Sequence, residues 1–162
     1  RYFRDKKLGD LTVVATDVGD ARRARHMADR LGVPIAIVEK RRIGNREKVE
    51  AVNLIGDVEG ACALIVDDEV DTAATLVATA DIVLRNGARE VYASATHPIL
   101  SGPAVQRIEE SSIKELVVTD TIPLTPEKRL PKITVLSVAP LLGEAIRRIH
   151  TGRSVGALFD EY

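Results

Sequence analysis

The chain has 162 residues, with 23 lysines and arginines against 24 aspartates and glutamates, which gives a net charge of −1. This length suits one domain with a real hydrophobic core, and the balanced charge gives no field that favours nucleic acid or a membrane surface. The single cysteine, Cys62, lies in an apolar run. An intrachain disulfide is therefore excluded, and we expect a buried structural thiol in a protein of the reducing cytoplasm.

Apolar runs and helical spacing alternate along the chain, and polar or proline-rich segments separate them. In chain order they predict a strand at Leu11–Ala15, a helix at Ala21–Leu31, a strand at Pro34–Glu39, a polar basic connection at Lys40–Ala51, a strand at Ala61–Val66, a helix from Ala73 to Gly87, a strand at Glu90–Ser94, a helix at Pro103–Glu110, a strand at Leu116–Thr119, a polar loop at Pro123–Pro131, a strand at Thr134–Ser137 and a helix at Ala139–His150. This alternation predicts an α/β fold in one domain, with a central parallel sheet flanked by helices on both faces.

Charged residues follow three of the predicted strands. Asp17, Lys40 and Asp67 each come just after a strand. Because ligands of such folds bind beyond the carboxyl ends of the strands, we expect one site built from three loops. Neither common nucleotide-binding glycine pattern, G-x-x-x-x-G-K-[ST] or G-x-G-x-x-G, occurs in the chain.

Two adjacent acids, Asp67 and Asp68, lie between an apolar strand and a helical pattern. Such carboxylates can accept hydrogen bonds from vicinal hydroxyls, while the unpaired N–H groups of a first helical turn can bind phosphate. This order of elements is therefore suited to a sugar phosphate. The plain structural alternative is an exposed strand end, with Asp71 or Thr72 as the N-cap of the helix, and the pattern alone leaves both interpretations open.

Three arginines crowd the start of the helix that follows the first strand. They are Arg22, Arg23 and Arg25. Cations at this positive end cost about 0.3–1 kcal/mol each unless an anion such as pyrophosphate compensates them. In the alternative interpretation, the arginines pair with Asp17, Asp20 and Asp29 on a solvated face.

Several segments, taken together, resemble one enzyme family. They are Asp17–Gly19, Val38–Arg42, Ile55–Gly60, Val66–Asp68 with Asp71–Thr75, Ala95–Ala104 and Ser137–Leu142. In this order they resemble the C-terminal half of ribose-phosphate pyrophosphokinases, which have a type I phosphoribosyltransferase-like fold. The resemblance covers nearly the whole chain, and the segments around Lys40–Arg42 and Thr96–Pro103 are more specific to this family than the acidic motif.

The resemblance implies a role for each matching residue. Asp67 and Asp68 would hold the ribose hydroxyls. The residues that would wrap the 5-phosphate are Asp71, Thr72, Ala73, Ala74 and Thr75. A loop of Asp17, Val18, Gly19 and Asp20 would hold the pyrophosphate portion, with Asp17 as a ligand of Mg²⁺. The resemblance also implies that Lys40 and Arg42 are catalytic and stabilise the pyrophosphoryl group during transfer.

Two residues depart from the family pattern, which has glycine at both positions. Ala74 replaces a glycine of the phosphate loop, and we expect weakened phosphate binding there, although alanine suits a helical φ. Asp20 replaces a glycine of the pyrophosphate loop, where its carboxylate would oppose phosphate binding unless magnesium or Arg23 screens it. Asp20 would also make a good N-cap. Either it points away and activity survives, or the chain is a weak or non-catalytic relative.

The implied reaction transfers pyrophosphate from ATP to ribose 5-phosphate, giving phosphoribosyl pyrophosphate and AMP with Mg²⁺ as cofactor. The resemblance also implies a homo-oligomer, based on dimers that build hexamers in the full-length family. We expect the chain to be the C-terminal half of a longer two-domain enzyme and to be incomplete alone. Two alternatives are a phosphoribosyltransferase that acts on a base and a non-catalytic regulatory or scaffold relative.

Overall fold

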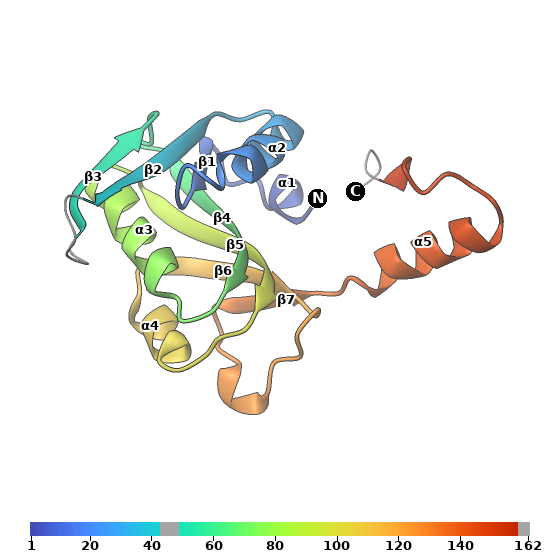
Figure 1. The fold of residues 1–162 in the computed structure, drawn as a ribbon. Coiled ribbons are helices and arrows are strands. Elements are labelled where there is room, and N and C mark those ends of the chain that lie inside the picture. The colour runs from blue at the N-terminus through green and yellow to red at the C-terminus, as the bar shows by residue number, and fades with distance from the viewer. Residues whose placement is uncertain (43–48, 159–162) are drawn as a thin grey trace.

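The computed structural model describes residues 1–42 and 49–158, and the side chains of residues 40–52 lie outside this description. Within the described residues, seven strands form one sheet in the order β3-β2-β1-β4-β5-β6-β7 (Figure 1). The strands are β1 (Leu11–Ala15), β2 (Ile35–Arg42), β3 (Val49–Ile55), β4 (Cys62–Val70), β5 (Glu90–Pro98), β6 (Ile113–Thr119) and β7 (Ile133–Leu136). The helices are α1 (Tyr2–Lys6), α2 (Ala21–Leu31), α3 (Ala74–Arg85), α4 (Ala104–Glu110), the short 3₁₀ helix η1 (Pro126–Lys128) and α5 (Ala139–His150).

Neighbouring strands of the sheet run parallel, with the exception of β3, which is antiparallel to β2. The predicted α/β class and parallel sheet are confirmed. The prediction of a polar, basic connection over Lys40–Ala51 is wrong at both ends, because β2 continues to Arg42 and β3 begins at Val49. A strand at the edge of a sheet needs only one hydrogen-bonded neighbour, so β3 needs no continuous apolar run.

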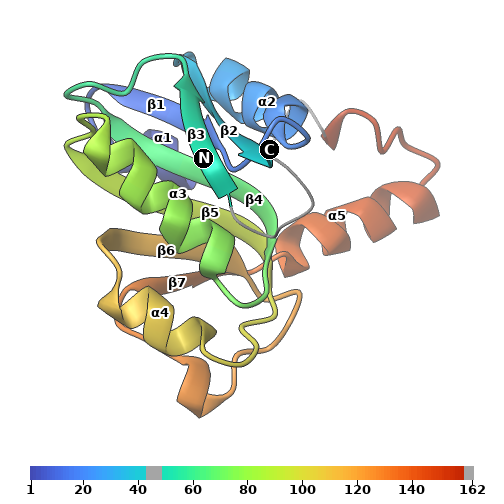
Figure 2. The same cartoon turned by 60° about the vertical axis from the view of Figure 1, so that its left-hand side comes forward.

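Helices cover both faces of the sheet (Figure 2). Successive residues of β4 point to opposite faces, and they divide the core into two layers. Ile65 packs with Leu76 and Val83 of α3 and with Ile108 of α4. On the other face, Leu64 and Val66 pack with Phe3 of α1 and with the small residues Ala24 and Ala28 of α2. Because alanines face the sheet, α2 lies close to β1 and β4.

Two central strands extend further than their apolar runs. The predicted strand Ala61–Val66 becomes β4, which continues to Val70, and the predicted strand Glu90–Ser94 becomes β5, which continues to Pro98. The two extensions pair with each other in parallel register, with Glu69 opposite His97. Backbone hydrogen bonds do not depend on side-chain polarity, so the pairing continues through acidic residues.

The helix α5 extends away from the sheet (Figure 1). Leu142, Ile146 and Ile149 share one face of it and are 56%, 67% and 69% exposed. The segment that follows α5 returns toward the N-terminal helices, and Leu158 is buried. Among the described residues, no helix combines the length and the apolar character that crossing a membrane requires.

We predict that Ile65→Ala lowers the free energy of unfolding by about 2–5 kcal/mol. The side chain of Ile65 is 0% exposed, because it points from the central strand β4 toward the helices α3 and α4. The measurement is equilibrium urea denaturation. The matched variant Ile65→Val removes one methylene and should cost about 0.5–1.5 kcal/mol. Equal effects of the two variants would contradict the predicted packing of this face.

Candidate functional site

A polar cavity of about 360 Å³ opens at the carboxyl ends of β1 and β4. These strands are neighbours in parallel register, with Ala15 beside Val66, so the loop after β1 meets the acidic end of β4. The residues that line the cavity are Thr16, Asp17, Asp20, Asp67, Asp68, Glu69, Val70, Asp71, Thr72, Ala73, Ala74, Thr75 and Leu76. The structure thus brings together most of the residues that the sequence assigned to the sugar and pyrophosphate loops.

The two adjacent acids lie inside β4 and not beyond it, since Asp67 pairs with Ala95 of β5. The expectation that Asp67 follows its strand is therefore wrong by a few residues. Their side chains differ in exposure. The side chain of Asp67 is 15% exposed and the side chain of Asp68 is 58% exposed. The backbone of Asp67 pairs with β5, and the backbone N–H of Asp68 donates a hydrogen bond of 2.8 Å to Oδ1 of Asp67, so both acids lie on ordered strand backbone.

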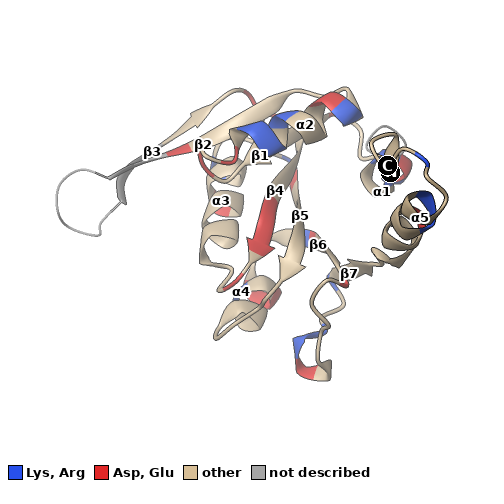
Figure 3. Ribbon diagram, turned by 45° about the vertical axis from the view of Figure 1, so that its right-hand side comes forward, with Lys and Arg blue, Asp and Glu red and all other residues tan. Residues whose placement is uncertain are grey.

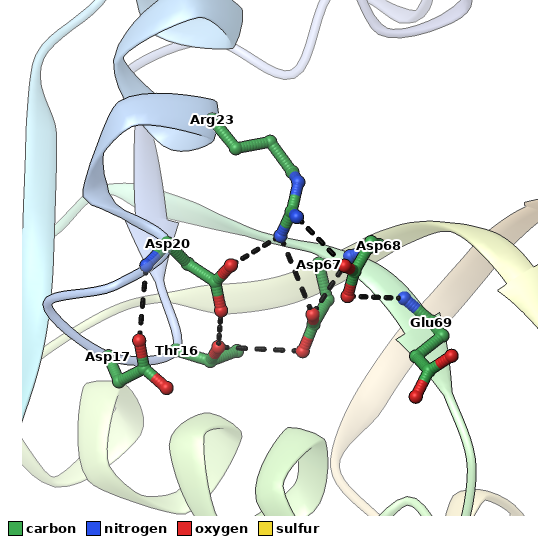
Figure 4. Close-up of polar contacts among 7 residues, drawn as sticks. All are labelled: Thr16, Asp17, Asp20, Arg23, Asp67, Asp68 and Glu69. Carbon is green, nitrogen blue, oxygen red and sulfur yellow. Dashed lines mark hydrogen bonds and ion pairs between the residues drawn. The ribbon is translucent and has the colours of Figure 1, made fainter.

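Arg23, on the first turn of α2, compensates this acidic cluster (Figure 4). Its Nη2 donates a hydrogen bond to Oδ2 of Asp68 at 2.9 Å, and its Nη1 forms an ion pair with Asp20. Nη1 also lies 3.7 Å from Oδ1 of Asp67. One guanidinium therefore connects the carboxylate at the N-cap of α2 with two carboxylates of β4. Acidic residues at the end of β4 lie close to basic residues of α2 (Figure 3).

The two adjacent carboxyls differ in their pKa values. Burial raises the pKa of Asp67 to about 6, and the neighbouring carboxylates of Asp68 and Asp20 contribute to the increase. The pKa of Asp68 lies below its usual value, because its hydrogen bond with Asp67 and the charge of Arg23 outweigh the effect of desolvation. The pair therefore titrates in two separated steps.

The loop after β1 is stabilised by its own acids. Oδ1 of Asp17 accepts a hydrogen bond of 3.1 Å from the backbone N–H of Asp20. A Cβ atom on Gly19 would lie 3.0 Å from that same oxygen, so a side chain at this position would crowd the turn. Val18 is 58% exposed at the tip of the loop. The close approach explains why this turn carries glycine.

Asp20 occupies the N-cap position of α2, but its side chain makes no capping hydrogen bond. Its Oδ2 instead accepts a hydrogen bond of 2.8 Å from Oγ1 of Thr16, and its other oxygen contacts Arg23. The prediction that its side chain caps the helix is therefore wrong. The pairing of the arginines with acids is confirmed in part, since Arg23 pairs with Asp20 and also with Asp68 of β4.

The first turn of α3 offers backbone N–H groups to the cavity. The first helical hydrogen bond runs from the N–H of Val77 to the carbonyl of Ala73, and no side chain caps the helix. In the described part of the chain, no side chain accepts a hydrogen bond from the N–H groups of Ala74 or Thr75. These groups lie at the positive end of the helix dipole, which is suited to an anion.

The turn before α3 has an unusual conformation. Ala73, at the N-cap position, has φ of +60° in the left-handed region, where a non-glycine residue costs about 1–2 kcal/mol. The N-cap alternatives Asp71 and Thr72 are therefore wrong. Ala74 begins the helix, so its replacement of glycine causes no strain, and the strained residue of this loop is its neighbour.

Side chains from distant segments hold this turn in place. Oγ of Ser101 donates a hydrogen bond to Asp71, and the backbone N–H of Ser101 donates to the Asp71 carbonyl at 2.9 Å. Nη1 of Arg107, on α4, donates to the carbonyl of Thr72 at 2.9 Å. The sequence analysis did not assign Ser101 or Arg107 to the site. Ser101 lies within Ala95–Ala104, a segment that carries the family resemblance, and this resemblance could have assigned Ser101 to the site.

Two predictions are not tested by the cavity geometry: the catalytic pair and the magnesium ligand. The backbones of Lys40 and Arg42 lie in β2, but their side chains are outside the described residues, so their catalytic assignment stays a prediction. In the described ranges, no group of three or more His, Cys, Asp or Glu side chains could hold a metal ion. Asp17 is exposed and lines the cavity. A single carboxylate is compatible with Mg²⁺, because proteins often bind this ion through one or two carboxylates together with phosphate oxygens of the substrate.

Comparisons with known proteins identify the family of this chain. A family model described as "Phosphoribosyl synthetase-associated domain" matches residues 42–160. Ribose-phosphate pyrophosphokinase from Oceanobacillus iheyensis is 55% identical over 159 residues, which cover 98% of this chain and 50% of the relative. The enzyme of the same name from Caldanaerobacter subterraneus subsp. tengcongensis is 55% identical over 160 residues, with the same coverage. The chain thus spans about half the length of the curated relatives it matches.

Two solved structures have a similar fold. The phosphoribosylpyrophosphate synthetase from Mycobacterium smegmatis superimposes with a TM-score of 0.84 at 37% identity, over 93% of this chain and 49% of that chain. The orotate phosphoribosyltransferase from Aeropyrum pernix has a TM-score of 0.55 at 17% identity, over 82% of this chain and 65% of that chain. This second likeness shows a shared fold.

We predict that Asp67→Asn stabilises the fold in a pH-dependent way. Because the pKa of Asp67 is raised from 3.8 to about 6, its contribution to stability is largest below pH 3.8 and is lost as the pH rises through 6. The variant should therefore gain up to about 3 kcal/mol relative to the parent between pH 4 and pH 7, at about 1.4 kcal/mol per pKa unit. Urea denaturation at both pH values measures this, with Asp81→Asn on α3 as the control. A difference between variant and parent that does not change with pH would contradict the assignment.

Proposed function

Because this chain belongs to the phosphoribosyl synthetase-associated domain family, we propose that it is the sugar-phosphate half of a ribose-phosphate pyrophosphokinase. The complete enzyme would transfer pyrophosphate from ATP to the 1-hydroxyl of ribose 5-phosphate, giving phosphoribosyl pyrophosphate and AMP. The observation that carries this proposal is the cavity itself, in which two carboxylates face an uncapped helix start. This pairing of hydrogen-bond acceptors with anion-binding donors matches the two ends of ribose 5-phosphate.

The carboxylates of Asp67 and Asp68 would accept hydrogen bonds from the ribose hydroxyls. Hydrogen bonds to charged acceptors contribute about 1.5–3 kcal/mol each, which supports a role in binding affinity as well as orientation. Asp68 is 58% exposed, so a ligand can reach it without rearrangement of the sheet. Its charge is favoured by Arg23, which keeps it an acceptor at neutral pH.

The phosphate would bind at the first turn of α3, within the loop Asp71–Thr75. The open N–H groups of Ala74 and Thr75 are the donors that support this assignment, together with the hydroxyls of Thr72 and Thr75 that line the cavity. Ser101 and Arg107 act as positioning residues, because they hold Asp71 and Thr72 without being cavity-lining groups themselves.

The pyrophosphoryl donor would bind on the side of Asp17–Asp20, next to the sugar. We propose Asp17 as a protein ligand of Mg²⁺, which supplies charge neutralisation for the transferred phosphates. Lys40 and Arg42 are proposed to stabilise the negative charge that develops during transfer. The other half of the enzyme would supply the remaining ATP contacts, and the assembled enzyme is proposed to be a homo-oligomer in the cytoplasm.

We predict that the chain binds ribose 5-phosphate saturably in isothermal titration calorimetry. The double variant Asp67→Asn with Asp68→Asn should bind at least tenfold more weakly, because both charged acceptors are lost. The matched control is Asp29→Asn with Asp81→Asn, which removes the same charge from exposed positions of α2 and α3 outside the cavity.

Two outcomes would overturn the site assignment. One is equal affinity of the double variant and its control. The other is equal affinity of the parent for ribose 5-phosphate and for inorganic phosphate, since the ribose would then contribute nothing. A parent chain that binds no ribose 5-phosphate at millimolar concentration would instead favour the scaffold alternative.

A further inference from the structure

Asp20 makes contacts that an anionic ligand of this loop would be expected to make. We infer that its carboxylate is a built-in competitor for the pyrophosphate group, so that this residue sets the affinity of the Asp17–Asp20 loop for the phosphate donor. The inference rests on the proposed function, in which this loop binds the pyrophosphate portion. It makes Asp20 a specificity-determining residue that lowers anion affinity while it leaves the sugar site in place.

The donors around Asp20 converge on its two oxygens (Figure 4). Oγ1 of Thr16 donates to Oδ2 at 2.8 Å, and the guanidinium of Arg23 forms an ion pair with Oδ1. Hydroxyl and guanidinium groups are typical donors to phosphate oxygens. Asp20 also lines the cavity, and its side chain is 20% exposed. The carboxylate therefore satisfies donors that a bound phosphate could otherwise use.

The carboxylate of Asp20 has no other structural task that the described residues reveal. It does not cap α2, although it occupies the N-cap position. The turn is fixed by its backbone N–H, which donates to Asp17, and this bond does not depend on the side chain. Asp20 has φ of −84° and ψ of −5°, a conformation that glycine and asparagine also adopt readily. Substitutions at this position should therefore change the charge and leave the loop folded.

The charge balance of the cluster opposes a further anion. Arg23 is shared by Asp20, Asp67 and Asp68, so among the side chains that the structure describes, one guanidinium forms ion pairs with three carboxyls here. Pyrophosphate would have to compete with Asp20 for Nη1 and to tolerate the neighbouring carboxylate. Removal of Asp20 takes away the nearest partner of Nη1 and of Oγ1 of Thr16, which keep longer contacts with Asp67 at 3.7 Å and 3.4 Å. Nη2 keeps its hydrogen bond to Asp68. The sugar-side contact of Arg23 thus survives the change.

The test is calorimetric titration of the whole chain with inorganic pyrophosphate at constant Mg²⁺ concentration. Asp20→Gly and Asp20→Asn should each bind pyrophosphate at least tenfold more tightly than the parent. Asp29→Asn, which removes the same charge further along α2, should stay within about twofold of the parent because exposed charges at that distance are screened. Adding Arg23→Gln to Asp20→Gly should abolish the gain.

The inference is overturned if Asp20→Gly and Asp20→Asn bind pyrophosphate no more tightly than the parent, including the case in which none of them binds it. It is also overturned if Asp29→Asn gives the same gain, since net charge would then explain the effect. Far-UV circular dichroism of each variant controls for folding. The titration with ribose 5-phosphate is a separate readout, so the sugar site can be supported while this inference fails.

Discussion

The site depends on how three carboxylates are kept close together by one cation. The parallel pairing of β1 with β4 brings the loop of Asp20 beside Asp67 and Asp68, and like charges at this spacing repel each other. Arg23 compensates them because α2 packs closely on the sheet through Ala24 and Ala28. Two alanine contacts in the core therefore determine where a surface guanidinium lies, and larger residues there would move it away from the acids.

Much of the fold could be predicted from the sequence, because the periodicity of buried residues is a local signal. Central parallel strands are covered on both faces and therefore read as continuous apolar runs, as in β1 and the first part of β4. The end of β4 could not be predicted in this way. Its acids interrupt the apolar run that indicates a buried strand. The strand continues because Glu69 pairs with His97 of β5, and this pairing is not visible in the local sequence. The edge strand β3 was not predicted for a related reason, since its one pairing partner in the sheet is the neighbouring strand β2.

The identities of the site residues were more predictable than their geometry. Asp67, Asp68 and Asp71–Thr75 could be grouped because they follow one another in the sequence, and they line one cavity. The left-handed conformation of Ala73 could not, since alanine gives no local signal for a positive φ. That conformation is held by Ser101 and Arg107, which are far away in sequence. The partners of Arg23 likewise depend on the pairing of β1 with β4, which cannot be predicted from the spacing of residues along the sequence.

The pairing of β1 with β4 also determines when the site can form during synthesis. Leu11 pairs with Cys62, so one central strand must wait for the other to leave the ribosome. At translation rates of about 5–20 residues per second, this wait lasts roughly 3–10 s. During that time β1 can pair with β2 on one side, but its other edge has no strand to pair with. The fold thus places one loop of the candidate site after a strand whose second sheet neighbour is synthesised about 50 residues later, and that open edge is vulnerable to misassociation until β4 pairs with it.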